Sequence, residues 1–573
     1  MIFISAQPDD FYFLWQLQLQ LLNFNKLGIN PESIHVLIGY NPLKGLSKEF
    51  ENYILENNQA SFFIYPDERK NKSYLPSLRP HILAKHFRQY PILEKATVFY
   101  HDSDIVFSKL PDFELLNQDE NWYTSDTRSY LDSNYIRQTA GEDVLKAMCQ
   151  IIGIQPSVVA ENDVHAGGAQ YLLKSCSASF WEKAQTDCEN IFLLLETYNK
   201  QVSFCNRKNN PKGIQAWCAD MWSLWWNALL AGKQFKIHSE LNFCWADSPI
   251  EEWQSTKILH YTGAVSKENK TIFRKVNYIH YPPFYDNLNG INKQTCSYSL
   301  TQIMQAVKEK QSENRIDLKD VSFLILVRVD SPDRLENLYA ITNYLTKYFN
   351  TTIFLLEVDS ESKIDRSLLH NDVQYSFIKD NSTKLHLTKY KNLLLKKCST
   401  TFISFYDTDV VFPIEQIVQT VTALKEKGYA IAFPYDGSFV SVDSLLKTMF
   451  TKLVDPELLE KNCNKFCTGT RRSFGGAVFL NRQIYIYAGM DNEYITSWGP
   501  EDIERVKRMA ILGYPAKRIN GNLYHLPHQR SENSGYQSDK EHYTLMSEFL
   551  KICSMKKTTL QKYIQTWHTN GNN

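Results

Sequence analysis

Two stretches that share one pattern organise this sequence: Thr97-Val-Phe-Tyr-His-Asp-Ser-Asp-Ile-Val-Phe107 and Thr401-Phe-Ile-Ser-Phe-Tyr-Asp-Thr-Asp-Val-Val-Phe412. Each is an apolar run typical of a buried β-strand, followed by Asp-Ser/Thr-Asp, an aliphatic residue and Val-Phe. The second stretch lies a domain length beyond the first. The spacing therefore indicates one domain plan used twice rather than a short structural repeat.

Strand and helix patterns alternate ahead of each stretch, as in βαβ units. The predicted elements are a strand, a helix and a strand in each half: Ile2–Ala6, Phe11–Asn25 and Ile34–Gly39, then Val321–Val327, about Asp333 to Phe349, and Thr352–Glu357. The sequence thus predicts an α/β protein with two tandem Rossmann-like domains. We expect a first domain over 1–290, a helical linker over 291–319 that contains a helix at Leu300–Lys310, and a second domain over 320–573.

The composition excludes some classes of function. The 573 residues include 63 basic and 63 acidic side chains, so the formal net charge is zero. A nucleic-acid scaffold or a polybasic membrane binder needs a basic face, and both are disfavoured. Aromatic residues make up 13% of the chain. That content fits large cores and surfaces that stack on sugars or bases equally well.

The sequence also predicts a cytoplasmic protein without a membrane span. No segment approaches the about 18 consecutive apolar residues that a transmembrane helix needs. The first apolar residues lack the basic region of a signal peptide, and Asp9 and Asp10 follow them directly. This pattern favours a first strand over a signal peptide. The 11 cysteines are scattered without a CxxC pair. This pattern suits a reducing compartment rather than a disulfide framework.

Asp407 and Asp409 follow a predicted buried strand, at the place where open α/β sheets bind ligands. Two carboxylates spaced i, i+2 in an extended turn can share one hard divalent cation such as Mg²⁺ or Mn²⁺. A solvated turn explains the triplet alone equally well. Downstream, Gly475 and Gly476 begin a strand, where a backbone can approach a ligand closely.

Four further side chains in the second half have both a structural and a functional reading: Glu501, Asp502, His525 and His528. The two acids stand at a predicted helix start, where they stabilise the helix dipole in any protein. The two histidines fit ordinary surface or core positions. All of them together, downstream of an acidic triplet, favour a metal-dependent site.

The second half resembles GT-A glycosyltransferases over about residues 320–530. Arg328-Val-Asp-Ser-Pro-Asp-Arg resembles the opening of the polysaccharide-synthesis kind. Phe474-Gly-Gly and Trp498-Gly-Pro-Glu-Asp-Ile-Glu resemble a motif shared by β-1,4-galactosyltransferases, polypeptide N-acetylgalactosaminyltransferases and chondroitin polymerases. At Pro500 the sequence departs from the galactosyltransferases, which usually have Gly at this position. The departure affects the predicted identity of the acceptor more than the predicted reaction.

The resemblance implies a role for each matching residue. It implies that Asp409 binds the metal, with His525 or His528 completing the shell, and that Asp502 is the base with Glu501 beside it. It further implies that Trp498 stacks on a sugar. The positions that it places at the nucleotide sugar are Arg328, Asp330, Asp407, Gly475 and Gly476.

The first half repeats the acidic triplet with different partners. Asp102 and Asp104 follow the strand, and His260 ends a later apolar strand. An Asp, Asp and His set suits Mn²⁺, which accepts mixed oxygen and nitrogen ligands. A strand-end histidine that caps a turn is an equally good explanation of His260. The pair Gly167 and Gly168 enters another strand.

The first half, over about residues 1–285, resembles retaining GT-A enzymes of the hydroxyproline arabinosyltransferase and peptidyl-serine galactosyltransferase kind. The matching motifs are Phe13-Leu-Trp-Gln16, Leu78-Arg-Pro80, Asp102-Ser-Asp104 and Asp220-Met-Trp222. The resemblance implies that Asp220 lies near the reacting sugar. It places Gln16, Asp102, Gly167 and Gly168 at the nucleotide or acceptor.

These observations predict a bifunctional glycosyltransferase that uses UDP-sugars and Mn²⁺ or Mg²⁺. The second domain is expected to invert the anomeric centre with a Gal, GalNAc or Glc type of donor, and the first to retain it. The acceptor is a glycan or glycopeptide, with peripheral contact to a lipid-linked acceptor as one form. Three alternatives stay open: a peptide or protein O-glycosyltransferase, one active domain beside a non-catalytic acceptor-binding domain, and a metal-dependent nucleotidyltransferase that releases pyrophosphate.

Overall fold

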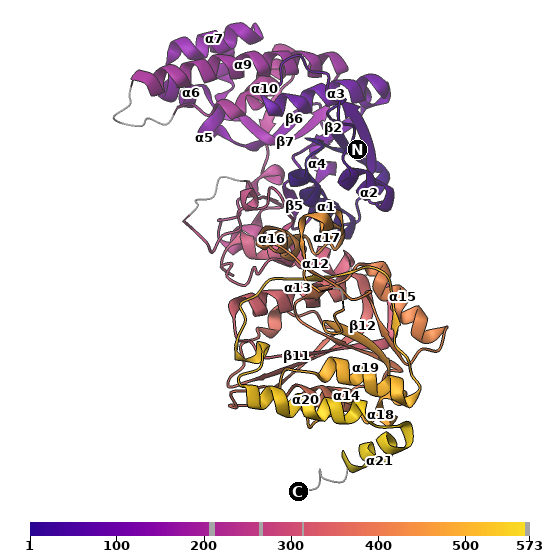
Figure 1. Ribbon diagram of the computed structural model, residues 1–573. Helices are drawn as coiled ribbons and strands as arrows, with labels where there is room; N and C mark the ends of the chain where they lie inside the picture. The colour runs from indigo at the N-terminus through magenta and orange to yellow at the C-terminus, as the bar shows by residue number, and fades with distance from the viewer. Residues whose placement is uncertain (206–212, 263–267, 312–314, 471, 568–573) are drawn as a thin grey trace. The chain divides into compact units, whose positions relative to one another are not determined.

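The computed structural model describes residues 1–205, 213–262, 268–311, 315–470 and 472–567 (Figure 1). The chain divides into two compact units, Met1–Phe284 with Leu288–Val307, and Tyr285–Asn287 with Lys308–Asn573. The division falls within helix α12 (Cys296–Gln311), and strand β11 begins at Ile316. The prediction of two tandem α/β domains is confirmed.

The first unit is built on a seven-stranded sheet with the order β3-β2-β1-β4-β7-β6-β8, beside a small sheet with the order β5-β10-β9. Strands β3, β2, β1 and β4 run parallel, β7 is antiparallel to β4 and β6, and β8 is parallel to β6. The bounds are β1 Ile2–Pro8, β2 Ile34–Tyr40, β3 Ser61–Pro66, β4 Thr97–Tyr100, β5 Ile105–Phe107, β6 Trp122–Asp126, β7 Gly167–Lys174, β8 Phe235–Ile237, β9 Phe243–Cys244 and β10 Ile258–His260.

The second unit repeats the strand order of the large sheet, and its small sheet has one more strand among the described residues. Its large sheet has the order β13-β12-β11-β14-β19-β16-β20, and its small sheet has the order β15-β21-β17-β18. Strand β19 is antiparallel to β14 and β16, as β7 is to its neighbours. The bounds are β11 Ile316–Val327, β12 Phe349–Asp359, β13 Val373–Lys379, β14 Phe402–Tyr406, β15 Val410–Val411, β16 Ile431–Phe433, β17 Ser438–Ser441, β18 Cys467–Thr468, β19 Ala477–Asn481, β20 Lys517–Arg518 and β21 Asn522–His525.

Helices cover both faces of each large sheet, so the central strands are apolar along their length. In the first unit, Ile4 of β1 belongs to a core with α3, α9 and α10, whereas Phe3 belongs to a separate core with α1 and α2. Successive side chains of a strand point to opposite faces, which explains the division. The helices are α1 Phe11–Lys26, α2 Lys48–Glu56, α3 Leu78–Gln89, α4 Phe113–Leu116, α5 Arg128–Leu131, α6 Ser133–Ala140, α7 Glu142–Ile152, α8 Pro156–Glu161, α9 Ala178–Cys205, α10 Ala219–Leu230 and α11 Ile250–Ser255.

In the second unit, Figure 1 shows α13 on one side of β11 and β12, with α14, α19 and α20 on the other. Helix α13 begins where the sequence predicts, because the Ser331 side chain accepts a hydrogen bond from Arg334 N and Pro332 occupies the first turn. The helices are α13 Pro332–Tyr348, α14 Leu387–Lys397, α15 Ile414–Lys425, α16 Ser444–Leu453, α17 Glu457–Lys461, α18 Arg482–Tyr487, α19 Glu501–Leu512, α20 Asp539–Cys553 and α21 Lys557–Trp567.

No helix among the described residues combines the length and the hydropathy that a membrane crossing requires.

Candidate functional sites

The two acidic turns occupy equivalent places in the two units. Strand β4 ends at Tyr100 and leads through Asp102 and Asp104 into β5, and β14 ends at Tyr406 and leads through Asp407 and Asp409 into β15. Both turns follow a central parallel strand at its carboxyl end and connect the large sheet to the small one. This end of an open α/β sheet is where such folds bind ligands.

In the first unit, the acidic turn meets the predicted histidine. Ligand atoms of Asp102, Asp104 and His260 all lie within 4.8 Å of one another. His260 Nε2 is 3.2 Å from Asp104 Oδ1 and 3.7 Å from Asp102 Oδ2. The antiparallel pairing of His260 with Ile105 sets this register, and Tyr261 N donates to Asp104 O at 3.2 Å.

Two cations that the sequence analysis did not single out neutralise this cluster. Arg79 of α3 forms ion pairs with both Asp102 and Asp220, and Lys275 forms one with Asp104. Burial opposes the ionisation of Asp104, but Lys275 and His260 outweigh it and hold the pKa of this carboxyl well below its ordinary value. The first acidic pair is therefore matched by side chains of its own unit.

A cavity of about 650 Å³ opens beside these groups. Asp102, Asp104, Asp220 and His260 line one part of it, as do Arg79 and Lys275. Aromatic side chains line much of the rest: Tyr100, Tyr130, Tyr171, Trp181, Trp217 and Trp245. Such a combination of flat apolar walls and a few convergent charges is typical of small-molecule sites, and aromatic faces suit sugar rings or bases.

Asp220, the predicted catalytic residue of the first unit, is in the first turn of α10 and lines the cavity. Its Oδ2 is paired with Arg79, and its Oδ1 lies 2.8 Å from the Tyr74 hydroxyl. Both oxygens therefore have protein partners. The side chain is placed near the acidic turn through Arg79, which joins Asp220 to Asp102.

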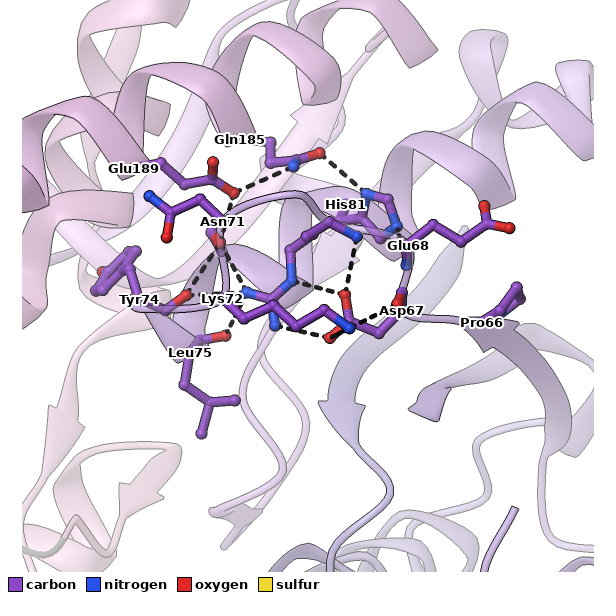
Figure 2. Close-up of polar contacts among 12 residues, drawn as sticks. Pro66, Asp67, Glu68, Asn71, Lys72, Tyr74, Leu75, His81, Gln185 and Glu189 are labelled. Carbon is purple, nitrogen blue, oxygen red and sulfur yellow. Dashed lines mark hydrogen bonds and ion pairs between the residues drawn. The ribbon is translucent and has the colours of Figure 1, made fainter. Parts of the chain in front are cut away.

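A loop between β3 and α3 supports the cavity wall. Arg69 is bound by both oxygens of Asp67, at 2.9 and 3.0 Å, and donates to Tyr74 O at 2.9 Å and Ser77 Oγ at 2.8 Å. Arg69 Nη1 also donates to Leu75 O at 3.3 Å, and Figure 2 shows dashed lines that end on Asp67, Tyr74 and Leu75. Since Leu75 lines the cavity and Tyr74 reaches Asp220, Arg69 positions two parts of the site without touching it.

Three predicted residues of the first unit have structural roles in this arrangement. Gln16 is buried; it donates to Tyr12 O at 2.6 Å and accepts from Ser103 Oγ at 3.3 Å, so it supports the acidic turn from beneath. A Cβ on Gly167 would lie 2.6 Å from Ser125 O, and one on Gly168 would meet Met221 Cε at 2.2 Å. Close packing against the backbone of the unit already requires Gly167, whereas the contact at Gly168 is with the end of a flexible side chain.

In the second unit, ligand atoms of Asp409, His525 and His528 lie within 4.8 Å of one another. His528 Nε2 is 3.0 Å from Asp409 Oδ2, and His525 Nε2 is 3.9 Å from the same oxygen. Two contacts bring the segment that carries both histidines to Asp409. Val410 pairs with His525, and Leu526 N donates a hydrogen bond to Asp409 O at 2.8 Å. Because both histidines lie beside Asp409, both stay candidates for the metal ligand.

Arg334 joins this cluster to the end of β11. It donates through Nε to Asp330 Oδ1 at 2.8 Å, and its Nη1 is 3.8 Å from Asp409 Oδ2. Asp330 also accepts from the Ser531 hydroxyl. The predicted Arg328 donates to Val358 O at 3.0 Å and to Ser382 O at 2.8 Å, and thereby ties the ends of neighbouring strands together.

Asp407 has an exposed side chain, and its environment differs from that of Asp102. The protein groups around its carboxyl displace water and raise its pKa to about 6, and the neighbouring carboxylates of Asp409 and Asp502 add to the effect, whereas Lys391 opposes it. Lys391 is itself buried and stays charged because Asp502 and Asp407 raise its pKa against the effect of burial. A carboxyl of this kind accepts additional positive charge readily.

Glu501 and Asp502 begin α19 and have unlike surroundings. Glu501 is buried, accepts from Gly499 N at 2.9 Å, and has its pKa raised to about 8 by burial and by Asp502. Asp502 keeps 29% of its side chain exposed and pairs through Oδ1 with Arg505 Nη1 at 2.8 Å. Its Oδ2 lies 3.1 Å from the point where a Cβ on Gly475 would stand.

The glycine pair connects the acidic turn to Asp502. Gly476 has a φ of +89°, and a Cβ there would be 2.5 Å from Leu523 Cδ1, so glycine is required. Its carbonyl accepts from Asp407 N at 2.8 Å, and that of Gly475 accepts from the Tyr435 hydroxyl at 2.7 Å. Trp498 precedes Glu501 and Asp502 in the chain. Its side chain is 42% exposed, and the centre of its ring is 5.2 Å from that of Tyr536.

The structure thus brings the predicted carboxylates and histidines of each half together. The cations around them were missed: Arg79, Lys275, Arg334, Lys391 and Arg505. Two of these arginines stand inside motifs that the sequence analysis quoted, so a signal for them existed. Lys275 and Lys391 have no motif around them, and only the tertiary fold brings them to the carboxylates.

No model of a known protein family matches the sequence, and no curated protein matches it. Solved structures of GT-A glycosyltransferases do match, and this is the class that the motifs of both halves resemble. A structure of GalNAc-T7 with UDP, GalNAc and Mn²⁺ is 12% identical with a TM-score of 0.29, over 45% of this chain and 55% of that one.

Two further structures match in the same range. The catalytic domain of Drosophila β1,4-galactosyltransferase 7, in complex with xylobiose, is 15% identical with a TM-score of 0.25, over 39% of this chain and 76% of that one. Residues 1–349 of S. aureus TarS, in complex with UDP-GlcNAc, are 12% identical with a TM-score of 0.28, over 44% of this chain and 75% of that one. At these TM-scores, the likeness does not say which sugar or acceptor this chain uses.

Proposed function

We propose that this chain is a glycosyltransferase with two sugar-transfer centres, each of which takes a UDP-sugar and a divalent cation, Mn²⁺ or Mg²⁺. One observation supports this most: the same Asp-x-Asp turn, with an imidazole beside it, follows the equivalent central strand in both units. A turn that is merely solvated has no reason to recruit a histidine from a distant strand in each unit.

The donor sets suit the proposed cation. Asp409 with His525 or His528 would hold it in the second unit, and Asp102 and Asp104 with His260 in the first. Carboxylate oxygens and imidazole nitrogens are ligands that Mn²⁺ accepts together. When bound, the cation supplies positive charge to the diphosphate of the leaving nucleotide.

In the second unit, Asp502 is the proposed general base of an inverting transfer. Its Oδ2 faces Gly475, where the missing side chain leaves room for an acceptor hydroxyl, and Arg505 holds Oδ1. The acceptor oxygen bonds to the anomeric carbon while the bond from that carbon to the phosphate oxygen breaks. UDP leaves with the electron pair, and Asp502 takes the hydroxyl proton. The exposed face of Trp498 would stack on a sugar.

In the first unit, the proposal is a retaining transfer in the cavity. Asp220 has both oxygens engaged by protein groups, by Arg79 and by Tyr74. It therefore orients Arg79 toward the acidic turn rather than accepting a proton from an acceptor. Because Asp220, at the place equivalent to Asp502, has a partner at each oxygen, the site suits a front-side transfer in which the leaving phosphate takes the proton.

We further propose a glycan acceptor, with a role in polysaccharide biosynthesis in the cytoplasm. The unpaired state of the buried thiols supports a reducing compartment: Cys149, Cys176, Cys188, Cys218, Cys244, Cys296 and Cys398 are free. A second candidate function, supported by the resident cations Arg79 and Lys275, is that the first unit binds the acceptor without turning over donor.

Full-length variants test both proposals. The wild-type chain and the variants Asp409→Asn, Asp104→Asn and their double variant are supplied with a panel of UDP-sugars, Mn²⁺ and a mixture of glycan acceptors, and UDP and products are measured. We expect each single variant to lose a different linkage. If only Asp409→Asn loses activity, the first unit is the acceptor-binding module. If the double variant keeps full activity, the proposed function is wrong.

A further inference from the structure

The two clusters differ in what already neutralises them. In the first, the Lys275 ammonium is paired with Asp104 Oδ2, while His260 Nε2 lies 3.2 Å from Oδ1 of the same carboxylate. In the second, the cation beside Asp409 is Arg334, whose Nη1 stays 3.8 Å away because its Nε is hydrogen-bonded to Asp330. No lysine pairs with Asp409 among the residues that the structure describes.

Lys275 is held at the first cluster from more than one side. Its ammonium lies 5.7 Å from the centre of the Tyr12 ring, in a cation–π arrangement, and only 15% of its side chain is exposed. It also lines the cavity beside Asp104. Because the Lys275 side chain is already fixed, its pairing with Asp104 loses little further conformational entropy. The ammonium therefore competes effectively with an ion from solution for the same carboxylate oxygen.

The histidine beside Asp104 is held by the core of its own unit. His260 Nδ1 is 3.2 Å from Gln170 Nε2, and the other end of this buried amide, Gln170 Oε1, is 2.6 Å from Ser125 Oγ. Asp104 therefore has the Lys275 ammonium at one oxygen and a positioned imidazole at the other.

The second cluster has no such tethered ammonium among the described residues. His528 Nε2 lies 3.0 Å from Asp409 Oδ2, and its Nδ1 lies 2.8 Å from Gln529 O and 3.4 Å from Arg334 Nη2. Asp409 is therefore surrounded by imidazoles and by a guanidinium group that Asp330 holds 3.8 Å away.

We propose that Lys275 is a tethered cation that stands in place of a divalent ion at the first cluster, so that the chain binds such an ion strongly only at the second. This inference rests on the proposed function, because it assumes that the second cluster takes a metal. It revises the proposed function at the first centre, where the Lys275 ammonium takes the place of the divalent cation, whereas the second centre still needs the ion.

Mn²⁺ binding to the full-length chain tests the proposal without any measurement of transfer. Free Mn²⁺ is followed by electron paramagnetic resonance during a titration, with no nucleotide present. We expect the wild-type chain to bind one Mn²⁺ and Asp409→Asn to bind none in the same range. We expect Lys275→Met to gain a second site, tighter by at least about tenfold than the residual first site of the wild type.

Three further variants make the result specific. Lys275→Met in the Asp409→Asn background should bind one Mn²⁺, which assigns the new site to the first cluster. Lys275→Arg should behave as wild type because it keeps the charge. Lys270→Met removes an exposed lysine of the same segment and should change nothing. Lys275→Gln replaces Lys275→Met if the latter does not fold, as judged by its thermal unfolding.

The outcomes separate the two proposals. Two equal sites in the wild type, or no second site in either neutral variant of Lys275, overturns the tethered cation and leaves the proposed function standing. No Mn²⁺ site in any variant overturns both. One site in the wild type and two in Lys275→Met supports the tethered cation and the metal site of the second centre, and it removes the divalent cation of the first centre from the proposed function.

Discussion

The starts of α10 and α19 present the same side chain at equivalent places in two similar units, yet they leave it in different states. Asp220 is engaged through both oxygens, by Arg79 and Tyr74. Asp502 gives one oxygen to Arg505, and its other oxygen faces the gap at Gly475. The topology is shared, so it decides where a carboxylate lies, and the cations around the carboxylate decide what it can do.

The same contrast holds for the acidic turns. Asp102 and Asp104 each have a cation from their own unit, whereas Asp407 has its pKa raised to about 6 because the loss of water around its carboxyl and the charges of Asp409 and Asp502 outweigh Lys391. The first turn is therefore complete without a ligand. The second has charge still to be matched, as expected of a site that takes up a metal and a diphosphate.

The largest difference between the units should follow from removing the free carboxylate. Asp502→Asn keeps the shape and removes the proton acceptor, so we expect kcat of the second transfer to fall by about 10²–10⁴-fold with little change in KM. Initial rates at saturating donor check this. The control is Asp539→Asn, an exposed acid at the start of α20. An unchanged kcat would assign the base elsewhere.

Arg505, the buried arginine that pairs with Asp502, should have the next largest effect, which is on the free energy of unfolding. Arg505 is 1% exposed in its side chain and also pairs with the buried Asp491 at 2.9 Å. Arg505→Met leaves Asp491 without its main partner, so the free energy of unfolding should fall by about 3–5 kcal/mol. Arg79→Met in the first unit should cost less, because that side chain is 22% exposed. Urea denaturation of both variants measures the difference, and equal losses would contradict it.

Arg69 offers a milder perturbation of the first unit. Arg69→Met removes hydrogen bonds to Asp67, Tyr74 and Ser77 and should lower the free energy of unfolding by about 1–3 kcal/mol. Because this loop carries Leu75 into the cavity wall, the KM of the first transfer should rise while the second transfer is unaffected. Arg69→Lys keeps the charge but loses the planar fork, and should restore little. Equal effects on both transfers would contradict this role.

The smallest effect concerns pH. Glu501 has its pKa raised to about 8 in the folded chain by burial, above its value in the unfolded chain. The folded state therefore holds a proton that the unfolded state has released, so stability falls as pH rises from the unfolded-state pKa toward about 8 and levels off above it. Glu501→Gln should flatten this dependence. Denaturation midpoints at pH 6 and pH 9 check it, and an equally steep fall in the variant would refute it.

Much of the fold followed from local patterns. The buried runs before the acidic turns became β4 and β14, and the helix predicted at about Asp333 begins one residue earlier, where Ser331 and Pro332 cap it. The duplication was visible because both copies keep the turn and the strand that positions it. Patterns of burial and capping are properties of adjacent residues, so one sequence suffices for them.

The chemistry of the sites was predicted less completely. His260, His525 and His528 do meet the aspartates, but Gln16 supports the turn from inside the core, and packing alone explains Gly167. The contact of Lys275 with Asp104 joins residues far apart in the chain with no motif around the lysine. Contacts between residues so far apart in the chain depend on the assembled fold, and no local sequence pattern predicts them.

The most direct test of the account is the binding of UDP to the full-length chain by calorimetry, with and without Mn²⁺. We expect a UDP site that requires Mn²⁺ and that disappears in Asp409→Asn, because the cation held at Asp409 joins the diphosphate to the protein. If no UDP site of the wild-type chain needs Mn²⁺, or if such a site is unchanged in Asp409→Asn, the account is contradicted.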